Sequence, residues 1–119
     1  MFFMARFRAV FHIDEGSLAK ANTVFHNVQN LLDDLGADEV EAAVLANGEG
    51  VKALLQKPNV HRALIRRLAG RGVQLLACEN SLRFLELSED DLLEPVRVVP
   101  AGVSELVKKQ AKGWAYVRP

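Results

Sequence analysis

The residue of this 119-residue chain best suited to covalent chemistry is its single cysteine, Cys78. Cys78 ends the apolar run Val73–Cys78 and is followed by Glu79–Ser81, which places it where a buried strand gives way to a helix. A thiol there lies near the unpaired N–H groups at the positive end of the helix, and these stabilise thiolate over thiol. The opposite interpretation is equally open, because free cysteine is among the most buried residue types and is usually inert.

With one cysteine, the chain can form no internal disulfide. Cys78 is therefore an apolar filler, a free thiol, a metal ligand or one half of an intermolecular bond. Its charged neighbours act in opposite directions on the thiol. The carboxylate of Glu79 disfavours a thiolate, whereas Arg83, one helical turn along, or a protonated His12 favours it.

Polar and small residues gather in four segments that each follow an apolar strand, namely 12–15, 47–50, 78–81 and 100–102. In open parallel sheets, ligands bind outside the carboxyl ends of the strands. We therefore expect a pocket beside Cys78 that is lined by His12, Asn47, Gly48, Glu49, Gly50, Asn80, Ser81, Pro100 and Gly102. The alternative is that these segments hold only the turn and cap residues that any such loop needs.

Other motifs indicate no further chemistry. The Gly48–Gly50 turn is too short for a dinucleotide fingerprint, and no Gly-Lys-Ser/Thr follows it as in a P-loop. The histidines have no metal-ligand spacing, so no metal site and no cofactor are expected. His26 and His61 are interpreted as packed or surface residues, and only His12 lies where a strand ends. No Gly-x-Ser-x-Gly nucleophile elbow occurs.

Hydrophobic periodicity predicts the elements that position these residues. Strands are expected at 6–13, 40–46, 73–78, 96–99 and 114–117. A long amphipathic helix is expected over 18–35, with an apolar stripe that starts at Leu18 and with Gly36 after its end. A short helix follows the glycine turn and runs to Leu55, and another opens at Pro58–Asn59, with Asn59 as its N-cap and Val60 facing inward.

The rest of the chain continues the alternation. Asn80–Ser81 is interpreted as the cap of a helix that carries Leu82 and Leu85, and Ser88–Asp91 has the spacing of a capping box. A last helix around Val103–Val107 ends before Gly113. Trp114 and Tyr116 project on one face of the final strand, as core or subunit-interface residues.

This order of elements predicts an α/β fold, a three-layer sandwich with a mostly parallel five-stranded sheet and helices on both faces. Residues 1–119 are expected to form a single domain. The strands that end at Ile13, Ala46, Cys78 and Val99 should share one carboxyl edge.

Composition excludes several classes of protein. Lys+Arg and Asp+Glu are equal at 15 each, so no overall field attracts nucleic acid or an anionic membrane. No apolar run approaches the roughly 20 residues needed to span a bilayer. The apolar start Met1–Met4 is too short for a signal peptide. A soluble, cytoplasmic protein is expected.

Taken together, the segments 12–15, 48–50, 78–83 and 99–103, with Gln110, Gly113 and the aromatic end 114–119, occur in the order seen in DsrE/DsrF-like proteins, which this chain resembles over nearly its whole length. The Cys-x-Asn-Ser-Leu element that begins at Cys78 and the Pro-x-Gly-Val element that begins at Pro100 are fairly specific in combination. The sequence departs from the family pattern at Asn47, where relatives often have His, and at Ala101, where Ser is common.

The resemblance implies a small α/β domain that assembles into trimers or hexamers, of which we expect the trimer. It also implies sulfur relay, with sulfur carried as a persulfide on Cys78 and exchanged with a donor or acceptor protein. Such chemistry needs one nucleophilic sulfur and no cofactor. The two departures remove a proton donor and a hydroxyl from the pocket but leave the thiol. The rival interpretation is a non-catalytic oligomeric module that binds a small anion at the same helix N-termini.

Overall fold

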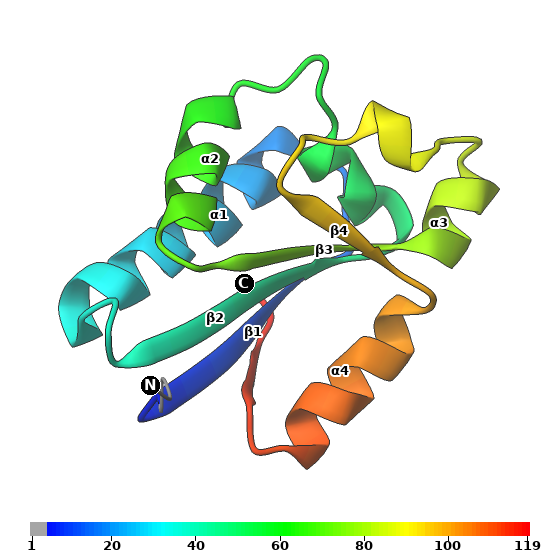
Figure 1. Ribbon diagram of the computed structural model, residues 1–119. Helices are drawn as coiled ribbons and strands as arrows, with labels where there is room; N and C mark the ends of the chain where they lie inside the picture. Colours follow the sequence, from blue (N-terminus) through cyan, green and yellow to red (C-terminus); the bar gives the residue numbers. More distant parts are fainter. Residues whose placement is uncertain (1–4) are drawn as a thin grey trace.

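Within residues 5–119, which the computed structural model describes, five strands form a wholly parallel sheet in the order β4-β3-β2-β1-β5 (Figure 1). The strands are β1 (Phe7–Ile13), β2 (Val40–Ala46), β3 (Gln74–Cys78), β4 (Val96–Val99) and β5 (Ala115–Val117). Ile13 pairs with Ala46 and Cys78 with Val99, so the predicted common carboxyl edge is confirmed. The apolar start 1–4, considered above as a leader, lies outside the described residues.

Helices cover both faces of the sheet, which confirms the predicted three-layer α/β fold. The α-helices are α1 (Leu18–Leu35), α2 (Arg62–Gly70), α3 (Glu79–Phe84) and α4 (Gly102–Ala111), and the 3-10 helices are η1 (Gly48–Leu54) and η2 (Glu89–Asp91). Figure 1 shows α1 and α2 on one face, α4 on the other, and α3 beyond the end of β3. The capping box predicted from Ser88 to Asp91 forms at the start of η2.

The apolar strands supply two cores, one on each face of the sheet. Successive residues of a strand point to opposite faces, so Val44 of β2 packs with α1 and α2 while its neighbour Leu45 packs with α4. The core under α4 is the smaller one and contains Leu76, Leu106 and Trp114. Cys78, two residues after Leu76 on β3, projects to this second face.

The helix α1 has the predicted bounds, with a capping residue at its start and Gly36 after its end. The Ser17 side chain accepts a hydrogen bond of 3.0 Å from the Lys20 N–H, and Gly36 ends the helix with a positive φ of 93°. Phe25 and the other central residues of the stripe are buried, but Leu18 is 63% exposed. The first position of the predicted stripe was therefore wrong, because Leu18 is the first helical residue and lies beyond the sheet.

The predicted start of α2 was also wrong. The helix begins at Arg62 rather than at Pro58–Asn59, and Asn59 instead forms a turn in which its side-chain oxygen accepts from the His61 N–H. The amide nitrogen of Asn59 donates to two carbonyls at the end of η1. Val60 lies in this turn and is 75% exposed rather than facing inward, because the helical spacing used to place it does not yet apply there.

Candidate functional site

Cys78 is both the last residue of β3 and the N-cap residue of α3. The apolar side chains before it hold the strand inside the sheet, and its own extended backbone, with φ −74° and ψ 119°, turns the chain into the helix. Its side chain is 5% exposed. The sulfur is therefore shielded from bulk solvent and lies beside the first N–H groups of α3, which have no partner within the helix.

Hydrogen-bond donors near Cys78 favour its thiolate form. Burial by itself raises the pKa of this thiol, but the hydroxyl of Ser81 and the backbone N–H groups of Gly102, Ser81 and Asn80 donate to it, and together they lower the pKa below its ordinary value. Two of the N–H groups belong to the first turn of α3 and one to the first residue of α4. The N-termini of α3 and α4 therefore both stabilise a thiolate at Cys78.

Ser81 connects the thiol to the glycine turn that follows β2. The Gly48 N–H donates to Ser81 Oγ at 2.7 Å, so the hydroxyl proton of Ser81 is free to point at the sulfur of Cys78. Gly48 has a φ of +55°, which other residues adopt at a cost and which aims its N–H at the serine. The segments 47–50 and 78–81, predicted to meet, are joined by this bond.

Gly102 closes the site from the side of α4. A Cβ atom at this position would lie 3.1 Å from Asn47 Cβ, from Cys78 Cβ and from Leu45 Cδ1. Contacts this short are rare between real side chains, so glycine lets the start of α4 lie close to the sheet without displacing these neighbours. The same contacts show that Asn47 and Cys78 both lie next to Gly102.

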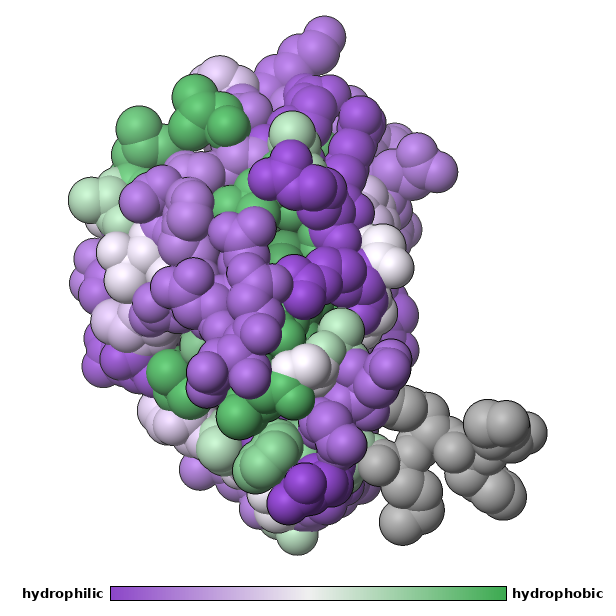
Figure 2. Space-filling model, turned by 90° about the vertical axis from the view of Figure 1, so that its left-hand side faces the viewer, coloured by the Kyte–Doolittle hydropathy of each residue, from purple (hydrophilic) through white to green (hydrophobic). Residues whose placement is uncertain are grey.

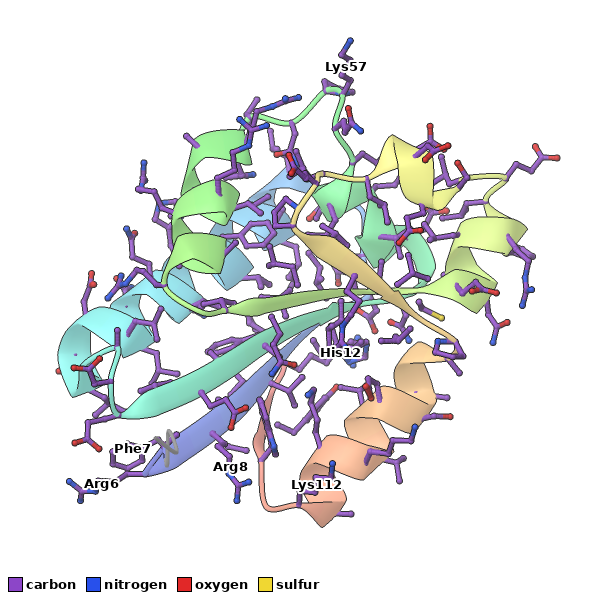
Figure 3. All side chains as sticks on the ribbon, in the orientation of Figure 1. Arg6, Phe7, Arg8, His12, Lys57 and Lys112 are labelled. Atoms are coloured by element: carbon purple, nitrogen blue, oxygen red, sulfur yellow. The ribbon has the colours of Figure 1, made fainter. Side chains whose placement is uncertain are left out.

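A chain of hydrogen bonds leads from Asn47 to the edge strand β5. Asn47 Oδ1 lies 2.7 Å from His12 Nε2, and His12 Nδ1 lies 2.6 Å from the Tyr116 hydroxyl. Because Oδ1 can only accept, Nε2 carries a proton, and in the neutral ring Nδ1 accepts from the tyrosine. His12 lies on the side of the sheet that α4 covers (Figure 3). It therefore holds Asn47 against Gly102.

A small cavity of about 260 Å³ opens beside the thiol, between the glycine turn and α3. Its lining includes Gly48, Glu49, Asn80, Ser81 and the 87% exposed Phe84, but not Cys78 itself. The cavity therefore borders Ser81, next to the thiol, but not the sulfur atom itself. A small molecule in this cavity would be separated from Cys78 by the Ser81 side chain.

The structure brings some of the expected pocket residues to Cys78 and leaves others apart. Gly50 is buried against β1, where a Cβ atom would lie 2.0 Å from the Ile13 carbonyl oxygen, so this glycine is needed for packing. Glu49 lines the cavity beside α3, but its carboxylate pairs with Lys52 at 2.6 Å. Pro100 is exposed, and none of the hydrogen bonds described for residues 5–119 joins it to the thiol.

The expected cap of α3 was wrong. Asn80 and Ser81 do not cap the helix, because it already begins at Glu79 and both residues lie in its first turn. The Asn80 side chain instead accepts from Arg83 at 2.6 Å. Arg83 also pairs with Glu79 at 3.2 Å, so its charge is engaged on the surface of α3.

Tyr116 is the site residue that sequence reasoning missed, since it was assigned to the core or to an interface. The strand order explains this: β5 lies next to β1, with Val10 opposite Tyr116, and places the hydroxyl beside His12. Trp114 does lie in the core, as expected. Nothing in the local sequence predicts which strand β5 joins.

The other histidines lie away from the thiol. His26 Nδ1 lies 2.9 Å from the Asn22 carbonyl oxygen, and the ring of His61 packs 5.8 Å from that of Phe25. Burial, and to a smaller extent the charge of His26, lowers the pKa of His61. In the described part of the chain, His, Cys, Asp and Glu side chains form no group of three that could hold a metal ion, and no helix is long and apolar enough to cross a bilayer.

Comparison with solved structures finds this fold in other proteins. The structure of a protein of unknown function, MTH1491 from Methanobacterium thermoautotrophicum, is 41% identical in sequence, with a TM-score of 0.89, over 95% of this chain and 99% of that one. The crystal structure of the ychN protein from E. coli shares the fold at 14% identity, with a TM-score of 0.76, over 98% of this chain and 100% of that one. A comparison with curated proteins finds no match.

A model of the DsrE/DsrF-like family matches residues 8–119. The match covers all five strands except Phe7, the first residue of β1, and it includes Asn80, Ser81 and Gly102 beside Cys78. The resemblance inferred from short motifs is thereby confirmed over nearly the whole length of the chain. This protein belongs to the DsrE/DsrF-like family.

Proposed function

We propose that this protein is a sulfur carrier, which takes sulfane sulfur onto Cys78 as a persulfide and passes it to the thiol of a partner. The observation that carries the proposal is the position of Cys78 at the carboxyl edge of the sheet, as the N-cap residue of α3 and against the first residue of α4. Donors at these helix starts lower the pKa of a thiol that burial alone would raise. Membership of a family associated with sulfur relay supports it.

The reaction needs only exchange at sulfur. The Cys78 thiolate attacks the outer sulfur of a persulfide or polysulfide donor, the donor's S–S bond breaks, and the donor leaves as a thiolate while a Cys78–S–S⁻ group forms. In the second step an acceptor thiolate attacks that outer sulfur, and the Cys78 thiolate leaves. Each step makes one S–S bond and breaks one, so neither needs an external oxidant or reductant.

The donor set acts on both steps. Hydrogen bonds from Ser81 and from the backbone of Asn80 and Gly102 stabilise the Cys78 thiolate, as nucleophile in the first step and as leaving group in the second. The backbone donors are held by the sheet and by two helices, so they need no rearrangement during the reaction.

His12 and Asn47 have a positioning role in this proposal. His12 bonds to Asn47 and Tyr116, and Asn47 packs against the same point of α4 as Cys78. They fix the wall of the site opposite α3. Gly48 and Ser81 form the opposite wall, next to the cavity of about 260 Å³ through which a small sulfur donor approaches.

Intact-mass spectrometry after treatment with polysulfide tests the proposal directly, because one cysteine means one possible site. The native protein should gain the mass of a sulfur atom, and a reducing thiol should remove it. Cys78→Ser, which changes the volume little, should gain nothing while keeping the circular dichroism spectrum of the native chain. A native protein whose mass stays unchanged contradicts sulfur transfer.

The same donors support a second candidate, a module that holds a small anion without reacting with it. Backbone N–H groups at two helix starts favour negative charge at one point, whether or not the charge is on sulfur. In that case polysulfide leaves the mass unchanged, and Cys78→Ser binds the anion as well as the native protein does. The two candidates therefore differ in both measurements.

A further inference from the structure

A second cavity, of about 530 Å³, lies between the beginning of the sheet and the end of α4. It is on the same face as Cys78 but at the opposite end of the strands. Positive side chains from two strands and one helix line it: Arg8, Arg97, Lys108, Lys109 and Lys112. Figure 3 shows Arg8 near the start of β1 and Lys112 at the end of α4, on the same side of the sheet.

These positive charges have few negative partners. The ion pairs found among residues 5–119 involve other side chains, and none joins any of the five within 4.0 Å. Two carboxylates, Glu41 and Glu105, also line the cavity, which leaves an excess of three positive charges there. The whole chain has a formal net charge of zero, so this excess is a local feature.

Lys109 is the most buried of the five, with 9% of its surface exposed. Its ammonium donates to Gln74 Oε1 at 3.2 Å and lies 4.1 Å from the centroid of the Trp114 ring. Burial lowers the pKa of this ammonium, which Glu105 and Glu41 partly offset and Arg97 and Lys112 reinforce. A buried cation in these surroundings is stabilised by any anion that enters the cavity.

The dipole of α4 accounts for only part of the cluster. Lysines in the last turn of a helix are favourable because the carboxyl end is negative, and this applies to Lys108 and Lys109. Arg8 and Arg97 come from β1 and β4, which are separated in the sheet by β2 and β3. The Arg8 guanidinium nevertheless approaches the end of α4, within 3.6 Å of where a Cβ atom of Gly113 would lie.

We infer that this cavity is a binding site for a multivalent oxyanion of metabolite size, distinct from the thiol site. Its volume lies in the range of small-molecule sites, about 300–1,000 Å³. Two arginines supply planar pairs of donors suited to phosphate-type groups, and the lysines add positive charge around them. The Trp114 ring, whose centroid lies 4.1 Å from the Lys109 ammonium, also lines the cavity. Figure 2, which looks onto the side where β1 and β2 begin, shows a hydrophilic surface broken by several hydrophobic patches.

Trp114 is the only tryptophan in the chain, so its fluorescence reports on this cavity. Inorganic pyrophosphate, added at constant ionic strength with chloride as the balancing anion, should change the emission saturably, with a dissociation constant below about 1 mM. Arg8→Gln combined with Arg97→Gln should weaken binding about tenfold or more, because each loses a charged donor. Cys78→Ser should bind like the native protein.

The matched control is Arg66→Gln combined with Arg67→Gln, which removes the same charge from exposed positions of α2. It should change the dissociation constant by less than about twofold. If the Arg8/Arg97 variant does not fold, Lys112→Gln alone should weaken binding about threefold or more. The inference is overturned if the native protein shows no saturable change, if the cavity variants bind as tightly as the native protein, or if the control loses affinity equally.

Discussion

The sulfur of Cys78 is distinguished from that of an ordinary core cysteine by its hydrogen-bond partners. A buried thiol in apolar surroundings has a raised pKa and reacts slowly. Here burial acts in that direction, but donors from Asn80, Ser81 and Gly102 outweigh it. The sequence left open whether Cys78 is a reactive thiol or a core filler. These two interpretations predict different rates of alkylation for the native protein.

We predict that the alkylation rate of native Cys78 by iodoacetamide rises with pH and levels off with a midpoint below about 8.5, the value of free cysteine. The sign follows from the lowered pKa, since more thiolate is present at any pH below the midpoint. Mass spectrometry at several pH values gives the rates, and the absence of other cysteines removes competing signals. Labelling that is seen only after denaturation would indicate the inert core cysteine instead.

Ser81→Ala tests the side-chain donor alone. It removes the hydroxyl that donates to the sulfur and accepts from Gly48, so the pKa of Cys78 should rise and alkylation at pH 7 should slow by about three- to tenfold. Ser104→Ala, at an exposed position of α4, is the matched control and should leave the rate unchanged. Equal rates for native protein and Ser81→Ala would mean that the backbone N–H groups alone set the pKa.

At the scale of the elements, the site depends on how closely α4 approaches β2 and β3. Gly102→Ala places a Cβ atom 3.1 Å from three side-chain atoms, which must move apart. We expect a loss of about 1–3 kcal/mol in the free energy of unfolding, measured by urea denaturation, together with slower alkylation of Cys78 as the Gly102 N–H withdraws.

Gly70→Ala, at the end of α2, is the control for that substitution. No atom lies within 4 Å of a Cβ built there, and the backbone has no positive φ. It should raise the free energy of unfolding by about 0.4–1 kcal/mol through the entropy of the unfolded chain. If both variants lose the same stability, the close contact at Gly102 is not the cause.

Periodicity and turn residues predicted the elements well because both are local properties of the chain. The alternation of apolar strands with helices gave the parallel sheet, and Gly36 marked the end of α1. The errors lie where tertiary contacts override a local signal. Asn59 looked like a cap but bonds to the end of η1, and Val60 is exposed in the turn that results.

Part of the candidate site was predictable from the order of strands and helices. Topology alone brings the segments after β1, β2, β3 and β4 to one edge of the sheet. The bonds within the site were not predictable, because the Gly48–Ser81 contact and the position of Tyr116 depend on loop conformation and on the place of β5 in the sheet. The direct donation by Gly102 likewise follows from packing and not from residue type.

On the scale of the whole molecule, the two faces of the sheet are covered unequally. Among residues 5–119, α1 and α2 pack on one face and only α4 packs on the other. The α4 residues Val103 and Val107 are 63% and 61% exposed. These two valines are one helical turn apart and lie on the same side of α4. Proteins of the DsrE/DsrF-like family typically form oligomers, and we propose that this surface is covered by a second copy of the chain.

We predict that the protein is a homotrimer, for which light scattering coupled to size exclusion should give three times 13.2 kDa at micromolar concentration. Val107→Glu should lower this mass, because a carboxylate buried at an interface loses its hydration. Val60→Glu, at a valine that is 75% exposed beside α2, should leave the assembly intact. A native mass of a single chain contradicts the trimer, and a Val107→Glu variant that keeps the native mass contradicts the assignment of the interface to α4.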